Sequence, residues 1–327
     1  MNRMARLAFA TAIAGTLVAL AAPGHAAGYK FSYIIHSSTN NAFWGAVKKG
    51  MDDACKLIDA DCQLVTVQND GNLQEQLTNL EATIAQKPDG IITTLVNDDI
   101  FDEAVHNARA AGILVVAANV DDTKGAAGNA RMSFIGQDLE QAGYDLAKAQ
   151  SANFPKGDIH ILLGVSGPGQ SWAEQRMHGV ARFLDEYKAA HKDWKVTYEK
   201  IDSGLDLSVT GSRVAAYVQS HPETKAYFDA GFWEAGAAQA LKDLGKKPGE
   251  ILLAGFDLLP VVMDQMKAGY VQLTIDQQPY LQGFLPVMQL YLMNKFKLGA
   301  WDVNTGKAIV TPADVPALEA LSKEGVR

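Results

Sequence analysis

The sequence predicts an α/β protein with two lobes of similar size, each built on a doubly wound parallel sheet. Three observations lead to this prediction: the strand-like runs are apolar along their whole length, amphipathic helical stretches separate them, and the alternation starts afresh after about residue 140. Strands without polar alternation are typical of parallel sheets that helices cover on both faces. We therefore expect two Rossmann-like lobes that face each other across a cleft.

The first half supplies one set of strands. The predicted strands lie at 31–36, 62–68, 90–96 and 113–119. Between the second and third of them, residues 73–86 carry Leu73, Leu77, Leu80 and Ile84 at helical spacing, which indicates a helix with one apolar face. A shorter extended segment, 132–138, ends this half.

The second half repeats the pattern. The predicted strands lie at 158–164, 195–201, 225–231, 251–257 and 270–276, with helices in the gaps, for instance at 206–220 and 234–244. No low-complexity linker separates the halves, so each must bury its own sheet. In such sheets ligands bind beyond the carboxyl ends of the strands, and clefts between domains are favoured ligand sites.

Charge and the first residues narrow the class of protein. The chain has 327 residues and a net charge of −8, without a basic run, which argues against nucleic-acid binding. Arg3 and Arg6 precede an apolar run, and small residues follow at Gly24 and Ala26, so residues 1–26 are predicted to be a signal peptide. A membrane anchor is disfavoured because the run is shorter than the ~20 residues that a span needs. We expect an exported protein without stable membrane insertion.

Cys55 and Cys62 are the only cysteines of the chain. In an oxidising compartment, a disulfide across the turn between a helix end and the next strand is one interpretation. Two separately buried thiols are the alternative. No histidine lies near enough in sequence to suggest a metal site with these thiols.

Polar and aromatic side chains gather where the predicted strands end. The candidate ligand-binding residues are Asn41, Phe43, Trp44, Asn119, Asp138, Trp172, Arg176, Phe232, Asp257 and Gln277. Amides both donate and accept hydrogen bonds, as sugar hydroxyls do, and a carboxylate and a guanidinium add charge-assisted bonds. Aromatic rings pack against the apolar C–H face of a sugar ring. This set predicts a small, neutral, polyhydroxylated ligand.

Each candidate has a structural alternative. Phe43 has helical core spacing with Val47 and Met51, whereas Trp44 is off that stripe and is expected to face the cleft. Arg176 could brace its domain through a salt bridge, and Asp257 could be the N-cap of the next helix. The glycine-rich segment after residue 164 lacks the ending of a phosphate-binding loop, and the chain has no G-x-S-x-G elbow and no H-E-x-x-H motif, so no enzyme is predicted.

Several segments give the sequence a family resemblance. They are "TNNAFWGAVKKG", "KPDGIITTLVNDD", "AGILVVAANV", "FIGQDLEQAG", "QRMHGVARF", "SHPETKAYF", "LAGFD" and "LTIDQQPYLQG". In their order and spacing, over about residues 30–310, the chain resembles the type I periplasmic sugar-binding proteins of the ribose- and galactose-binding kind. The resemblance implies a periplasmic, monomeric receptor without a cofactor that hands a monosaccharide-like ligand to the permease of an ABC importer. A sensory co-receptor for a chemoreceptor or sensor kinase is the alternative.

The resemblance also carries residue roles. The asparagine and the stacking aromatics of the family fall on Asn41, Phe43 and Trp44, its buried arginine on Arg176, its ligand-binding carboxylate on Asp257 and its hinge glutamine on Gln277. A further aromatic position of the family holds Leu205. Many such proteins carry Asp-Arg where Asn119 and Val120 stand here, and Asn-Asp near the position of 231–233. Fewer charged groups and more aromatic ones favour a deoxy sugar, a polyol or a cyclitol.

The topology of the family implies three crossover segments between the lobes. We place them near 136–139, 276–280 and 304–306. The N-terminal lobe would then comprise 28–137 plus 278–304, and the C-terminal lobe 138–277 plus 305–327.

Overall fold

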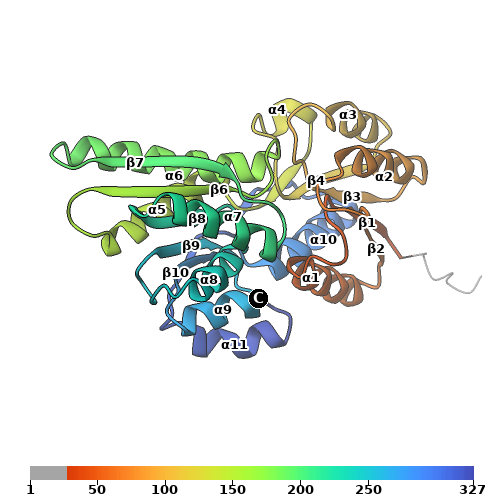
Figure 1. Cartoon of the computed structure of the whole chain (residues 1–327). Helices are drawn as coiled ribbons and strands as arrows, with labels where there is room; N and C mark the ends of the chain where they lie inside the picture. The colour runs from red at the N-terminus through yellow and green to blue at the C-terminus, as the bar shows by residue number, and fades with distance from the viewer. Residues whose placement is uncertain (1–27) are drawn as a thin grey trace, which may run out of the picture.

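The structure is a computed structural model, which describes residues 28–327, so the predicted signal peptide (1–26) lies outside the described residues. Two six-stranded sheets define two lobes that lie side by side (Figure 1). The predicted two-lobed α/β fold is thus confirmed. Within residues 28–327, no helix is both long enough and apolar enough to cross a bilayer.

The N-terminal lobe has the strand order β11-β5-β4-β3-β1-β2, and all its strand pairs are parallel. Its strands are β1 (Lys30–Ile34), β2 (Asp61–Val65), β3 (Gly90–Thr93), β4 (Leu114–Asn119), β5 (Ser133–Gly136) and β11 (Val303–Asn304). Its helices are α1 (Phe43–Ile58), α2 (Leu73–Ala85), α3 (Asp102–Ala110), α4 (Ala126–Asn129) and α10 (Pro279–Phe296). The central strands β1, β3 and β4 are almost wholly buried, as their apolar sequences predict.

The C-terminal lobe has the order β12-β10-β9-β8-β6-β7, in which only β12 is antiparallel to its neighbour. Its strands are β6 (Ile159–Val165), β7 (Val196–Asp202), β8 (Thr224–Asp229), β9 (Leu252–Phe256), β10 (Val271–Asp276) and β12 (Ala308–Val310). Its helices are α5 (Leu139–Gln150), the short 3₁₀ turn η1 (Ser151–Asn153), α6 (Ser171–Ala190), α7 (Leu207–Ser220), α8 (Glu234–Asp243), α9 (Pro260–Lys267) and α11 (Val315–Lys323).

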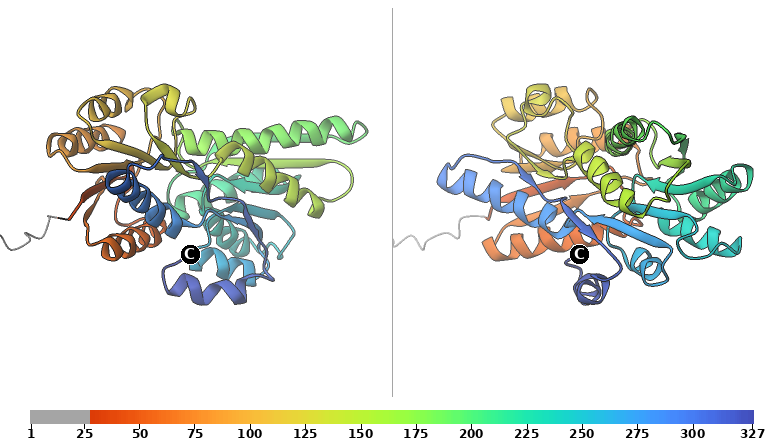
Figure 2. Two further views of the ribbon diagram at one scale, coloured as in Figure 1. Left: turned by 180° about the vertical axis from the view of Figure 1, so that it is seen from behind. Right: turned by 90° about the vertical axis from the view of Figure 1, so that its left-hand side faces the viewer.

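The chain passes from one sheet to the other at three places. It leaves the first sheet between β5 and α5, returns between β10 and α10, and leaves it again between β11 and β12. Figure 2 shows α10 beside α1 in the N-terminal lobe and the last segment of the chain passing on to the C-terminal lobe. The residue limits that we assign to the two domains stay a prediction.

Glycines bring helices α1 and α10 into backbone contact. A Cβ atom on Gly50 would lie 2.1 Å from the carbonyl oxygen of Tyr280, and one on Gly283 would lie 1.9 Å from that of Val47. No side chain fits at either position, so the two helices lie as close as their backbones allow. This packing fixes where α10 begins, and with it the position of Gln277 just before the helix.

A disulfide joins Cys55 near the end of α1 to Cys62 in β2, with the two Cα atoms 6.2 Å apart. Of the two interpretations that the sequence leaves open, the structure has the disulfide. It ties the helix that carries Phe43 and Trp44 to the edge strand of the N-terminal sheet.

Candidate functional site: a pocket between the lobes

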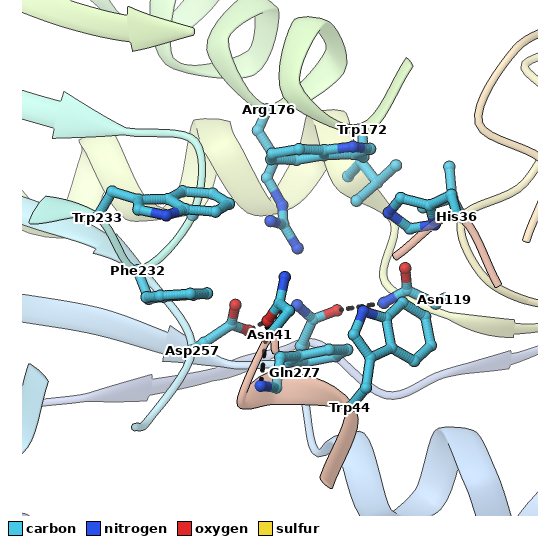
Figure 3. A pocket seen from close by; sticks show the side chains of 14 residues that line it. His36, Asn41, Trp44, Asn119, Trp172, Arg176, Phe232, Trp233, Asp257 and Gln277 are labelled. Carbon is cyan, nitrogen blue, oxygen red and sulfur yellow. Dashed lines mark hydrogen bonds between the residues drawn. The ribbon is translucent and has the colours of Figure 1, made fainter. Parts of the chain in front are cut away.

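A pocket of about 430 Å³, including its mouth, lies between the lobes at the carboxyl ends of both sheets. The lining residues are His36, Asn41, Phe43, Trp44, Asn119, Val120, Leu139, Trp172, Arg176, Gly231, Phe232, Trp233, Asp257 and Gln277. Figure 3 draws these residues and labels ten of them, which reach the pocket from segments far apart in the sequence.

Both lobes contribute to the pocket because each sheet ends there. The N-terminal lobe supplies residues from the turn between β1 and α1 and from the end of β4. The C-terminal lobe supplies residues from the start of α6 and from the turns that follow β8 and β9. Gln277 stands in the crossing between β10 and α10. A ligand here would touch both lobes at once.

Aromatic rings bound the pocket on two sides. In the C-terminal lobe, Phe232 stacks on Trp233 with ring centroids 4.5 Å apart, and Trp172 lies 6.0 Å from Trp233. In the N-terminal lobe, Phe43 and Trp44 meet edge to face, with centroids 5.2 Å apart. Figure 3 shows Trp172, Trp233 and Phe232 across the pocket from Trp44. Flat faces of this kind suit the apolar face of a ring-shaped ligand.

The distinction that the helical spacing draws between Phe43 and Trp44 does not hold. Each side chain is 5% exposed, each packs in the core of the N-terminal lobe, and each lines the pocket. Both stand in the first turn of α1, where core and pocket meet, so burial and a lining position are compatible.

Arg176 is buried and points from α6 into the middle of the pocket (Figure 3). Its Nε donates a hydrogen bond to Oε1 of Gln137 at 2.9 Å, and its Nη1 donates to the carbonyl oxygen of Ala230 at 2.7 Å. The guanidinium lies 4.1 Å from the ring centroid of Phe256. Among residues 28–327 no carboxylate forms a salt bridge with it, so the salt-bridge alternative is wrong.

Asp257 follows β9 and has a backbone φ of +74°. Helix α9 begins at Pro260 and its N-cap is Leu259, so the interpretation of Asp257 as an N-cap is wrong. Its Oδ1 accepts a hydrogen bond from Nε2 of Gln277 at 2.6 Å. Oε1 of Gln277 in turn accepts one from Nδ2 of Asn119 at 3.3 Å. This chain of bonds runs from the end of β4 in one lobe to the end of β9 in the other.

Burial shifts the ionisation of the charged groups in the pocket. Burial raises the pKa of Asp257 to about 6. The charge of Arg176 and the hydrogen bond from Gln277 act in the opposite direction but are outweighed by burial. Burial also lowers the pKa of Arg176 to about 10. The pKa of His36 falls to about 4 for the same reason. At pH 7 the pocket therefore holds one guanidinium, one carboxylate and a neutral imidazole.

His36 and Asn41 are partly engaged by the protein. Nδ1 of His36 forms a hydrogen bond with Oγ1 of Thr94 at 3.0 Å, and its ring meets Trp44 edge to face. Oδ1 of Asn41 accepts from the backbone N–H of Phe43 at 3.2 Å, and its Nδ2 donates to Oδ2 of Asp70 at 3.2 Å. These bonds hold the start of α1 in place at the pocket.

The structure brings together nine of the ten candidate residues, and Asp138 is the exception. Oδ1 of Asp138 accepts from the backbone N–H of Gln141 at 3.2 Å, so this residue is the N-cap of α5 and is exposed. The next residue, Leu139, lines the pocket instead. Asp138 is therefore corrected to a helix cap, because the open N–H groups of the helix attract its carboxylate away from the cleft.

Sequence reasoning left some lining residues outside the candidate list. They are His36, Val120, Leu139, Gly231 and Trp233. Three of them, His36, Val120 and Gly231, lie within two residues of a strand end, and this position was the available signal. Leu205 does not line the pocket and packs, partly buried, against the core.

The fold and the pocket define a substrate-binding protein, and comparison with known proteins gives the family. The chain matches the family described as a periplasmic binding protein domain over residues 31–297, and it belongs to this family. The resemblance to type I sugar-binding proteins is thereby confirmed, and the relatives found are substrate-binding proteins of transport systems, not enzymes.

Three similar proteins illustrate the relatives of this chain. A xylose/arabinose-binding protein of Sulfolobus acidocaldarius is 30% identical over 312 residues, which cover 91% of this chain and 75% of that protein. The D-allose-binding periplasmic protein of Escherichia coli is 26% identical over 279 residues, which cover 81% of this chain and 85% of that protein. The crystal structure of a periplasmic sugar-binding protein of an ABC sugar transporter from Legionella pneumophila aligns with a TM-score of 0.78 at 26% identity, covering 85% of this chain and 100% of that one.

Proposed function

We propose that this protein captures a neutral monosaccharide, polyol or cyclitol between its two lobes in the periplasm and delivers it to the permease of an ABC importer. The observation that carries the proposal is the pocket itself, in which aromatic faces from both lobes surround one carboxylate, one guanidinium and several amides. The xylose/arabinose-binding and D-allose-binding proteins among its relatives support the same ligand class.

The charges of the pocket favour an uncharged ligand. Asp257 and Arg176 carry opposite charges at pH 7, and His36 is neutral, so the pocket as a whole offers no net charge. Hydroxyl groups satisfy both, because they donate to a carboxylate and accept from a guanidinium. Asn119 and Gln277 add amides of the same dual character. A charged ligand would leave one of the two ionic groups facing a like charge.

Closure of the lobes follows from where the contacts lie. The lobes already touch beside the pocket, where the N–H of Ser171 donates to the carbonyl oxygen of Val96 at 3.0 Å. A ligand that contacts both lobes stabilises this closed form relative to an open one, because only the closed form makes both sets of contacts. The importer would then recognise the closed pair of lobes.

A ligand screen followed by one substitution tests the proposal. We expect a pentose, a hexose, a polyol or a cyclitol from a panel including D-xylose, L-arabinose, D-allose and myo-inositol to raise the melting temperature of the protein. Asp257→Ala should abolish binding of that compound in calorimetry while leaving the circular dichroism spectrum unchanged. Asp138→Ala is the matched control, since this acidic residue lies near the pocket but caps a helix. Wild-type affinity in Asp257→Ala would remove Asp257 from the site.

A further inference from the structure

A second cluster of ligating side chains lies in the C-terminal lobe, at the end of its sheet opposite the sugar pocket. His160, His221 and Glu223 each present one ligand atom, and these atoms all lie within 4.8 Å of one another. His160 stands at the start of β6, whereas the pocket lies beyond the other end of the strands. From His160 to the end of β6 at Val165 the strand has six residues, and at about 3.3 Å per residue the cluster lies roughly 20 Å from the pocket end of the sheet. The cluster is therefore no part of the site described above.

Three regular elements hold the cluster in place. In the sheet, His160 is paired with Thr197 of β7 on one side and with Thr224 of β8 on the other. His221 is the C-cap of α7, and its backbone N–H donates to the carbonyl oxygen of Tyr217 at 2.8 Å. Figure 1 shows β6, β8 and α7 together in this lobe.

The turn that leads into β8 places the third ligand. Both the backbone N–H and Oγ1 of Thr224 donate to the carbonyl oxygen of His221, at 3.0 Å and 2.8 Å. This turn brings Oε1 of Glu223 to 3.5 Å from Nδ1 of His221. Helix end, turn and strand thus fix the three backbones, while the side chain of Glu223 is exposed and that of His221 is partly exposed and stacks on Tyr217 with ring centroids 4.2 Å apart.

Both ring nitrogens of His160 have a hydrogen-bond partner in the structure. Nδ1 lies 2.8 Å from Oγ1 of Thr197, and Nε2 lies 2.7 Å from the hydroxyl of Tyr217, which itself donates to Glu199 at 2.6 Å. The Tyr217 hydroxyl gives its proton to Glu199, so Nε2 of His160 donates to Tyr217 and Nδ1 accepts from Thr197. A cation at Nε2 therefore replaces the bond to Tyr217, and the ring proton moves to Nδ1, where the Thr197 hydroxyl can accept it.

We propose that His160, His221 and Glu223 form a binding site for one divalent late transition metal of the zinc class. Two imidazoles and one carboxylate are ligands that zinc takes, with a water molecule completing a tetrahedron. Zinc bonds of about 2.0–2.2 Å require ligand atoms nearer to one another than they are here, by about 1–1.5 Å. Rotation of the exposed Glu223 side chain, together with a turn of the partly exposed His221 ring away from Tyr217, supplies this approach. The bound ion cross-links β6, the end of α7 and the start of β8.

Titration of the untagged protein (residues 28–327) with Zn²⁺, in competition with a chromophoric chelator, tests the site. We expect one equivalent of Zn²⁺ to bind and to raise the melting temperature. Changing residues that only orient a metal ligand costs about 10–100-fold in affinity, so His221→Ala should weaken binding by at least about tenfold. Glu223→Gln should also weaken it. Both residues are partly or fully exposed, so neither change threatens the fold.

Two controls separate this site from other histidines and from the sugar pocket. His106→Ala removes an exposed histidine of α3 in the other lobe and should leave Zn²⁺ affinity unchanged. Asp257→Asn, which alters the sugar pocket, should also leave it unchanged. The proposal is overturned if the wild-type protein binds no Zn²⁺, if His221→Ala binds it as tightly as the wild type, or if His106→Ala loses as much affinity as His221→Ala.

Discussion

Lowering the pH from 7 to 5 is expected to weaken ligand binding through a single carboxyl group. Burial raises the pKa of Asp257 to about 6, so this group changes charge within that range. Protonated, it loses its charge and half of its capacity to accept hydrogen bonds from ligand hydroxyls. The other ionisable groups that line the pocket keep their charge, because the pKa of Arg176 is about 10 and that of His36 about 4.

The magnitude follows from the fraction of Asp257 that is ionised. With a pKa of about 6, the ionised fraction is roughly 0.9 at pH 7 and roughly 0.1 at pH 5. If only the carboxylate form binds, the dissociation constant rises about tenfold over this range, which corresponds to about 1.4 kcal/mol. Above pH 7 the affinity should level off, because the group is then almost fully ionised.

Isothermal titration calorimetry at pH 5, 6, 7 and 8, with the compound that the ligand screen identifies, measures this dependence. Asp257→Asn is the control: the amide keeps the shape of the side chain but does not titrate, so its weaker binding should be independent of pH. An affinity of the wild-type protein that is the same at pH 5 and pH 7 would refute the reasoning. So would a tenfold change that persists in Asp257→Asn, since another group would then carry it.

Three further predictions concern stability and fluorescence. The pKa of Asp257 is higher in the folded protein than its ordinary value of 3.8, so its contribution to stability is full below pH 3.8 and is lost as the pH rises through 6. Without ligand, Asp257→Asn should therefore be more stable than the wild type at pH 7 by up to about 3 kcal/mol in urea unfolding. An equally or less stable variant would contradict this. Replacing both Cys55 and Cys62 by alanine opens a closed loop with a sequence separation of 7 and should lower the free energy of unfolding by about 2–3 kcal/mol; an unchanged urea midpoint would show that the disulfide adds nothing. Ligand binding should change tryptophan fluorescence, because Trp44, Trp172 and Trp233 line the pocket. Replacing all three by phenylalanine should remove most of that change, and a full signal in the triple variant would place the reporter elsewhere.

The sheets could be predicted because their strands are buried on both faces. A run such as 90–96 has no polar alternation, and β3 forms within it, wholly buried. The short strands β11 and β12 carry no such signal, because two or three residues at a sheet edge bury little. Their places in the two sheets depend on long-range packing, and the sequence pattern reports only local periodicity.

The pocket residues could be predicted where a strand end and a polar residue coincide, as at Asn119 and Asp257. The prediction failed at Asp138, because the pattern does not say whether a carboxylate near a strand end turns to the ligand or to the next helix. The outcome depends on the backbone conformation. Asp138 has an extended backbone, and its carboxylate accepts from the N–H of Gln141 in α5. Asp257 has a left-handed backbone, and its carboxylate accepts from Gln277. Trp233 was left out of the candidate list because the sequence does not say which of two neighbouring aromatic residues faces the pocket; in the structure Phe232 and Trp233 stack on each other and both line it.

Backbone strain and hydrogen bonding meet at the crossing between the lobes. Asn119 and Asp257 both have positive φ, a conformation that costs a residue other than glycine about 1–3 kcal/mol. Gln277 links their side chains, accepting from one and donating to the other. An amide is the side chain that can do both at once, whereas a glutamate could not donate to Asp257 and a leucine could do neither. The strained turns, one in each lobe, are therefore held through the segment that joins the lobes, and a ligand that bonds to Asn119 or Asp257 acts on the same network that sets how the lobes meet.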